Sequence, residues 1–311
     1  MRFLFGLVIA CLVACQSFVA AQITLVPPSD KYPRSFEKIK KYAERSEWKV
    51  DVPVKREGGR VSPRALRLIV PSPFTAGGDS IAKNSLLPTT PQSSIYRFKY
   101  LDVSADVQPE FPFKYVEVDW NTEGAPRGPN GSFITPHYDF HFYVKDRAFV
   151  EKDMECMTSG KTCDSQKTGY HQMRHFLDLP PDRFIPEKYF PDNDSSITEM
   201  GMHTLDGNFN YTVDNVNHNP VIIYGTFDGE LAFLEVSMTL YGFQDAMKAA
   251  RKGQKLSWDI LQPKAYAFPW WATKVTLEYL PASKSFAFEF DGFELRKVEP
   301  YRRTGRQTTP D

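Results

Sequence analysis

The sequence predicts a mainly β protein, an antiparallel sandwich or barrel with a few short helices. Bulky and charged residues alternate over residues 96–101 and 113–120, as in strands with one buried face. The dipeptide Asp228-Gly229 separates two apolar runs, and both residue types tolerate the positive φ of a tight hairpin turn. Helical periodicity, by contrast, is confined to short stretches.

The elements follow from these patterns in chain order. A helix is expected over residues 33–46, where apolar residues recur at helical spacing and Ser35 can act as the N-cap. A polar stretch rich in Gly and Pro follows, interrupted by a short apolar run at 66–70. Two further short helices are expected, one ending at Gly253. The expected strands are 96–101, 113–120, 138–144, 221–227, 231–240, 274–279, 286–290 and 293–298, and the two further helices are 166–176 and 245–252.

The first 21 residues have the features of a secretory signal peptide. Arg2 supplies a positive charge, an apolar run follows, and small residues precede Gln22 at the cleavage positions. An alternative interpretation is a bacterial lipobox ending at Cys15, which would give a lipid-anchored envelope protein. No later stretch is apolar over 18 residues, so no membrane span is expected. The expected organisation is a signal peptide (1–21), an N-terminal helix with an irregular extension (22–94), a β-rich domain (95–300) and a polar tail (301–311).

If the protein is secreted, its cysteines are expected to be oxidised and its three sequons become candidate glycosylation sites. Cys156 and Cys163 remain after signal cleavage and are expected to close a small disulfide loop. A thiolate metal site is the alternative, but no C-x-x-C spacing favours it. In a eukaryotic host, glycosylation is expected at Asn130, Asn193 and Asn210.

The balance of charge restricts the partners. Lys and Arg total 38, Asp and Glu total 38, and the formal net charge is zero. This balance excludes binding to nucleic acid or anionic lipid that depends on overall positive charge. An unidentified small molecule or extracellular partner remains, and a homo-oligomer is possible.

The histidines indicate where chemistry occurs. In an extended strand His137, Asp139 and His141 share one face, while the aromatic residues between them occupy the other. His137 and His141 are then ~13 Å apart, too far to bind one ion unless the strand bulges. Glu199 and His203, in a later glycine-containing segment, are the best additional donors. We therefore expect a divalent transition metal (zinc, copper or iron) bound by His141, His203 and either Asp139 or Glu199, with His137 nearby.

Structural interpretations of the same residues stay open. His137 and His141 could be half-buried and hydrogen-bonded to Asp139 and a tyrosine. His171 and His175 are spaced as on one helix face, where a solvated role is the simpler expectation. His218 is expected on the surface, and Trp270-Trp271 could bind a sugar, although such residues more often pack in the core or at its rim.

Four segments together carry a resemblance to a known family. They are VDWNTEGAPRGPNG (118–131), PHYDFHFY (136–143), EMGMH (199–203) and IYGTFDGELAFLE (223–235). In this order they resemble an uncharacterised family of secreted or envelope proteins, mostly bacterial, with the motifs W-N-x-x-G-H-x-P, P-H-x-D-F-H-F-Y, M-G-x-H and I-Y-G-x-Y-D-G. The resemblance covers about residues 95–245 and implies a β-rich fold that can form oligomers, with no assigned reaction. Where the family pattern has His after Gly124, this chain has Ala125; if that His is a ligand in the family, this chain lacks it or uses another group.

Two functions are therefore expected. The first is a secreted metal-binding protein that can act as a metal-dependent hydrolase or oxygenase if an open coordination position activates water or O₂. The alternative is a non-catalytic extracellular binding or matrix protein whose histidines are structural.

Overall fold

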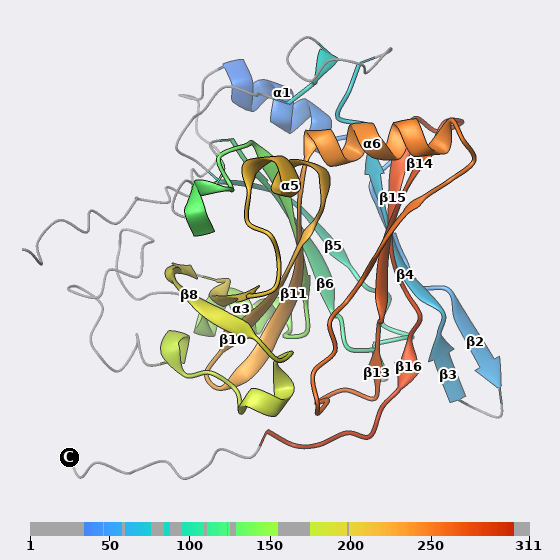
Figure 1. Cartoon of the computed structure of the whole chain (residues 1–311). Helices are drawn as coiled ribbons and strands as arrows, with labels where there is room; N and C mark the ends of the chain where they lie inside the picture. Colours follow the sequence, from blue (N-terminus) through green and yellow to red (C-terminus); the bar gives the residue numbers. More distant parts are fainter. Residues whose placement is uncertain are drawn as a thin grey trace, which may run out of the picture.

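The fold is a sandwich of two open antiparallel sheets (Figure 1). The computed structural model describes residues 34–45, 47–57, 60–75, 84–87, 95–108, 111–122, 124, 129–154, 175–197 and 199–301. Within these residues every pairing between neighbouring strands of the two sheets is antiparallel. The prediction of a mainly β, antiparallel fold is confirmed, and the sandwich is the form that it takes.

The larger sheet has seven strands and carries most of the predicted functional residues. Its central strands pair through long registers, interrupted between β10 and β11 by a bulge at Gly225 and Thr226, and the Asp228-Gly229 turn joins these two strands as the hairpin that the sequence predicts. Both turn residues have positive φ. In spatial order the strands are β5 (Ile95–Asp102), β6 (Tyr115–Asn121), β7 (His137–Tyr143), β11 (Glu230–Thr239), β10 (Val221–Phe227), β9 (Gly201–Asp206) and β8 (Tyr189–Ile197).

The smaller sheet combines the two ends of the described chain. Its strands in spatial order are β1 (Lys49–Asp51), β4 (Ala65–Pro71), β15 (Ser285–Asp291), β14 (Lys274–Leu280) and β12 (Leu256–Asp259). β4 contains the apolar run 66–70 and pairs along its whole length with β15. The segment 22–94 thus supplies strands to the sandwich, beyond the helix and irregular extension expected for it.

Two small pairs of strands lie beside the sandwich. β2 (Val54–Glu57) pairs with β3 (Arg60–Pro63), and β13 (Trp270–Trp271) pairs with β16 (Glu294–Leu295). The strand expected over 293–298 is therefore limited to the two residues of β16. Trp271 is buried and contacts Phe113, so its ring belongs to the core.

The helices are short and lie at the edges of the sheets. They are α1 (Arg34–Ala43), α3 (Arg147–Asp153), α5 (Val213–His218) and α6 (Leu240–Ala250), with 3-10 turns η1 (Pro129–Gly131) and η2 (Asp182–Phe184). α6 starts earlier than residue 245 because the Thr239 hydroxyl accepts a hydrogen bond from the amide of Tyr241 and caps it. Of the helix expected over 166–176, only residues 175 and 176 lie in the described chain, and both are helical. None of the helices in the described ranges has the length and apolar character needed to cross a bilayer.

The two sheets enclose an aromatic core. Phe140 of β7 packs on Phe288 of β15, and Phe142 packs on Phe290, with ring centroids 4.7 and 4.5 Å apart. Phe243 of α6 packs on Phe288 as well, with centroids 5.6 Å apart. The even-numbered residues of β7 thus face the smaller sheet, as the alternation predicts.

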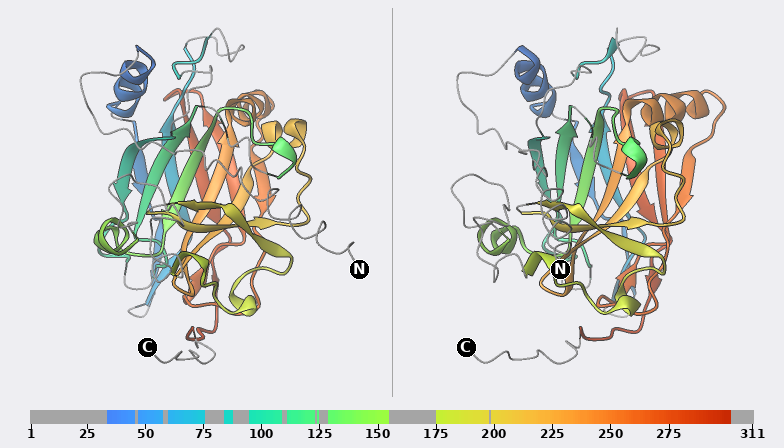
Figure 2. Two further views of the ribbon diagram at one scale, coloured as in Figure 1. Left: turned by 90° about the vertical axis from the view of Figure 1, so that its left-hand side faces the viewer. Right: turned by 60° about the vertical axis from the view of Figure 1, so that its left-hand side comes forward.

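The outer face of the larger sheet is buried as well. Every residue of β6 and β7 is buried, although the alternation over 113–120 predicts only one buried face. The β8–β9 hairpin lies across this outer face and covers it (Figure 2). The charged residues of β6 and β7 are consequently enclosed in protein and shielded from water.

Candidate metal centre

A strip of buried polar side chains crosses the outer face of the larger sheet. It separates an apolar cluster around Tyr143 and Phe233 from a second cluster around Phe133 and Val221. Buried charges are expensive unless they are paired or bind a metal, so the strip requires a physical explanation. We define the polar strip as Arg97, Glu117, Asp119, His137, Asp139, His141, Glu199, His203, Glu235 and Ser237.

Three members of the strip converge on one point. His141, His203 and Glu235 each offer a ligating atom, and these atoms all lie within 4.8 Å of one another. The same oxygen of Glu235, Oε2, is 3.3 Å from Nε2 of His141 and 3.3 Å from Nε2 of His203. His141 is 1 % exposed, His203 is 5 % exposed and Glu235 is 3 % exposed. We call this group the His-His-Glu triad.

The sheet register produces this convergence. His141 on β7 lies directly opposite Glu235 on β11, so their side chains are neighbours on one face. His203 lies on β9, directly opposite Gly225 of β10, and β10 is the next strand after β11. Gly225 has no side chain, and a Cβ there would lie 2.1 Å from the Phe233 ring. The glycine therefore leaves room for the Phe233 ring, which packs against both imidazoles, with centroids 4.9 Å from His141 and 5.3 Å from His203.

Asp119 lies behind the triad. Its Oδ2 is 3.2 Å from Nδ1 of His141, on the side of the ring away from Glu235. A carboxylate on one imidazole nitrogen fixes the orientation of the ring and makes the other nitrogen a better metal ligand. Tyr143 stacks on the same imidazole with centroids 5.9 Å apart. His141 is thus held by a carboxylate on one side and by aromatic rings around it.

Burial and close charges shift the pKa values of these groups. Burial and the nearby charge of Glu117 raise the pKa of Asp119 to about 7. Burial alone would lower the pKa of His141, but Glu235 and Asp119 outweigh burial and raise it well above the usual value. Burial opposes ionisation of Glu235, yet His141 and His203 hold its pKa below its usual range. Without a metal, His141 therefore retains a proton between two carboxyl groups.

The contacts of His141 are nevertheless poor hydrogen bonds. Neither of its ring nitrogens makes a hydrogen bond of good geometry to a described residue, and the same holds for Oε2 of Glu235. Atoms that approach one another without bonding well are expected where they point to a common central ion. The donor set, two imidazoles and one carboxylate, suits zinc and non-haem iron.

The other residues proposed from the sequence have different partners. His137 Nε2 is 3.3 Å from Oδ1 of Asp139, and Asp139 accepts a hydrogen bond of 2.5 Å from the Ser237 hydroxyl. Nδ1 of His137 lies 2.8 Å from the carbonyl oxygen of Thr135. Glu199 forms an ion pair with Arg97. The structure thus brings His141 and His203 together, while His137, Asp139 and Glu199 form contacts beside the triad.

Two important residues were missed by the sequence analysis. Glu235 completes the triad and Asp119 supports His141, but the sequence analysis assigned a role to neither. A usable signal existed: Glu235 is a lone acid in a strand that is otherwise apolar or uncharged between Leu231 and Thr239. A single acidic residue in such a strand is typical of a buried, partnered charge.

The remaining candidate sites fall in several places. Cys156, Cys163, Ala125 and His171 lie outside the described residues, as does the signal segment 1–21. Of the sequon residues, Asn130 and Asn210 are exposed, and nothing is described of the side chain of Asn193.

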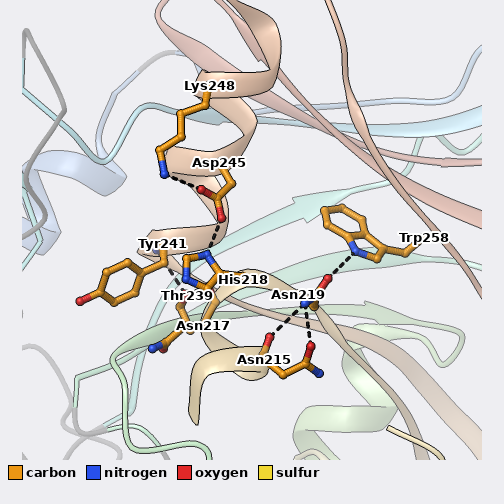
Figure 3. A network of polar contacts seen from close by, with 9 residues as sticks. All are labelled: Asn215, Asn217, His218, Asn219, Thr239, Tyr241, Asp245, Lys248 and Trp258. Carbon is orange, nitrogen blue, oxygen red and sulfur yellow. Dashed lines mark hydrogen bonds and ion pairs between the residues drawn. The ribbon is translucent and has the colours of Figure 1, made fainter. Parts of the chain in front are cut away.

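Two further histidines lie away from the strip. His175 pairs with Asp228, with a distance of 2.7 Å between Nδ1 and Oδ1. His218 pairs with Asp245 at 2.5 Å in a partly exposed network between α5 and α6 (Figure 3).

Searches against protein-family models, curated proteins and solved structures gave no match for this chain. The function must therefore be inferred from the geometry and chemistry of the polar strip.

Proposed function

We propose that the protein binds one divalent transition metal through His141, His203 and Glu235 and uses it as a catalytic centre. The convergence of three ligating atoms from β7, β9 and β11 within 4.8 Å carries this proposal. Three protein ligands leave at least one coordination position for water, O₂ or a substrate atom. With zinc the expected chemistry is hydrolysis, and with iron it is oxygenation.

The charge of the strip supports the same proposal. Five carboxyl groups (Glu117, Asp119, Asp139, Glu199 and Glu235) lie with one guanidinium, that of Arg97, in a region largely shielded from water. Without a metal, balance requires protons on His141 or on a carboxyl group such as Asp119. A divalent ion supplies two positive charges at the point where Glu235 and the imidazoles meet, and it would displace the proton from His141.

The surroundings suit a catalytic metal. Phe233 and Tyr143 form an apolar wall around His141, which lowers the local dielectric constant and strengthens the effect of the ion. Asp119 supplies the outer carboxylate that fixes the metal-binding imidazole.

We extend the proposal to location and family. The signal-like segment 1–21 supports secretion, with lipid anchoring at Cys15 as the alternative. The four ordered motifs support membership of the uncharacterised family of secreted or envelope proteins; they include His141 and His203, and Glu235 follows shortly after the last of them. In this proposal the substrate is a small extracellular molecule, because the triad lies in a largely enclosed space.

Metal analysis tests the proposal directly. Metal-free protein is titrated with Zn²⁺, Cu²⁺ or, anaerobically, Fe²⁺, and bound metal is measured after desalting. About one equivalent of at least one metal is expected, and excess metal should raise the thermal midpoint, with about 2.7 kcal/mol of stabilisation at 100 times Kd. Glu235→Gln and His203→Gln should lose this binding. His218→Gln, which removes an imidazole paired with Asp245 outside the strip, is the matched control and should bind normally.

Binding below about 0.2 equivalents with every metal would reject the metal centre, because a preformed three-ligand site should bind tightly. In that case the histidines are structural, and the non-catalytic binding protein becomes the better interpretation. The absorption spectrum of the Co²⁺ form then separates the two roles for a bound metal. A spectrum that changes on adding azide indicates an open position, and an unchanged spectrum indicates a closed structural site.

A further inference from the structure

The Arg97–Glu199 ion pair joins opposite sides of the larger sheet. Arg97 lies on β5, which is one edge strand, and Glu199 lies in the turn between β8 and β9 at the other edge. Their side chains nevertheless form an ion pair, so the β8–β9 turn reaches back across the outer face. Both views in Figure 2 show the yellow β8–β9 hairpin crossing in front of the green strands of the sheet. We call this ion pair the clasp.

The clasp lies beside the metal triad. His203 follows Glu199 by four residues on the same hairpin, and Glu117, the other partner of Arg97, lies directly opposite His141 in the register. The Glu199 carbonyl also accepts a hydrogen bond of 2.8 Å from the hydroxyl of Tyr143, whose ring stacks on His141. The same turn that carries the clasp therefore brings one ligand to the triad and covers another.

The turn is held in a constrained backbone conformation. Glu199 has φ 64° and Gly201 has φ 82°, both in the left-handed region. A Cβ at Gly201 would lie 2.3 Å from the carbonyl oxygen of Thr226, so the hairpin lies tightly on β10 at this point. The Glu199 amide donates to the Met154 carbonyl at 2.9 Å. A non-glycine residue keeps this conformation only when its contacts fix it, and the clasp is one of those contacts.

Exposure identifies the side of the clasp that can open. The side chain of Glu199 is 23 % exposed, whereas Arg97 is 7 % and Glu117 is 2 % exposed. If Glu199 turns outward, Arg97 keeps its 2.9 Å ion pair with Glu117 and no buried charge is left alone. Opening at Glu199 is thus the least costly way to expose the triad to water.

We infer that the Arg97–Glu199 ion pair is the closing contact of the metal centre, and that metal ions enter and leave where Glu199 moves away from Arg97. This inference rests on the proposed metal site and adds the path by which it is filled. A closing contact changes the rate of opening without changing the ligands. Weakening it should therefore speed metal uptake and metal release by the same factor and leave Kd unchanged.

The test measures both rates with Zn²⁺. Release is followed with excess chelator and uptake with a fluorescent zinc indicator, in the wild type and in Glu199→Gln. Both rates should rise about tenfold, the factor expected for loss of one charge-assisted hydrogen bond, with Kd changed by less than about twofold. Tyr143→Phe removes only the hydroxyl contact with the same turn, so it should raise both rates by about threefold.

Asp228→Asn is the matched control. Asp228 also lies at positive φ in a turn of this sheet and forms an ion pair, but with His175 at the β10–β11 turn. Its substitution should leave both rates at the wild-type values.

The outcomes separate the two proposals. A wild type that binds no metal rejects the proposed function itself. A wild type that binds Zn²⁺, with unchanged rates in Glu199→Gln, overturns the clasp and leaves the metal centre standing. Faster release without faster uptake would raise Kd. This result would also overturn the clasp as an entry point, because Glu199 would then act by positioning the metal ligands.

Discussion

The two faces of the seven-stranded sheet are both buried, yet they differ in chemistry. On the inner face of β7 are Tyr138, Phe140 and Phe142, and on the outer face are His137, Asp139 and His141. Burial of apolar side chains on the inner face stabilises the fold, because it removes apolar surface from water. Burial of charged side chains on the outer face costs free energy, because these groups lose their hydration. A buried polar face is a poor way to stabilise a sheet. The difference therefore indicates that the inner face holds the fold together, and it agrees with the proposal that the outer face holds a metal.

A large loss of stability is expected from truncation of a ring on the inner face. Phe140→Ala removes a ring that packs on Phe243 and Phe288 and leaves a cavity between the sheets. The free energy of unfolding should fall by about 3–5 kcal/mol, measured by urea denaturation of the metal-free protein. Phe190→Ala, at a ring that is 40 % exposed, should cost less than about 0.5 kcal/mol. Equal effects at the two positions would mean that the inner face is not the stabilising core.

The next test replaces four buried polar residues of the outer face with leucine. A variant with Leu at positions 119, 141, 203 and 235 removes the triad together with Asp119, so no member is left with an unpaired charge. Such replacements are often neutral or stabilising, and we expect the metal-free protein to keep its stability or gain about 1–4 kcal/mol. Metal binding should disappear. By contrast, His141→Ala alone should cost about 3–5 kcal/mol, because it leaves two carboxyl groups without their shared partner.

A large loss of stability in the Leu variant would contradict the comparison. It would show that the outer face stabilises the fold through its polar contacts, as expected if the histidines are structural.

Within the polar strip, one substitution tests whether the Asp119 carboxylate supports the metal-binding imidazole or is only buried near it. Asp119→Asn keeps the shape but weakens the carboxylate contact with His141, and the affinity for Zn²⁺ should fall about 10–100-fold. Asp139→Asn, at a carboxyl group that is also buried but is paired with Ser237 and His137, is the control and should change affinity by less than about threefold. Competition with a chelator of known affinity measures both. Similar losses in the two variants would argue against a specific role for Asp119.

The smallest effect is expected in a carboxylate–histidine pair that is partly exposed. Asp245 contacts His218 and Lys248 (Figure 3), and although burial opposes its ionisation, these partners hold its pKa below the usual value. Asp245→Asn should cost about 0.5 kcal/mol at pH 7, since such pairs contribute little in water.

The sign of the pH dependence follows from the lowered pKa. A carboxyl group whose pKa is lower in the folded state stabilises the protein above its unfolded pKa of about 3.9, and this contribution is lost as the pH falls through the folded value. The difference in stability between wild type and Asp245→Asn should therefore be present at pH 7 and vanish in acid. Thermal unfolding between pH 7 and pH 2.5 measures it, with the exposed Glu278→Gln as control. A difference that grows in acid would contradict the assignment.

Local sequence patterns were sufficient for most of the β structure. Alternation identified the segments of β5, β6, β7, β10, β11, β14 and β15, and the Asp-Gly turn identified the β10–β11 hairpin. These signals are local, because side-chain alternation and turn conformation depend on neighbours in the chain. The pairing of β4 with β15 joins segments about two hundred residues apart, and no local pattern records it.

For the candidate site, the sequence by itself determined which face of β7 carries His137, Asp139 and His141 and that two of these residues are too far apart for one ion. It also marked the segment that carries His203. Only the tertiary structure decided that His141 and His203 meet, that Glu235 joins them, and that Asp119 faces the far side of His141. The physical reason is that these contacts depend on strand order and register across β6, β7, β11, β10 and β9, which are set by the packing of the whole sheet.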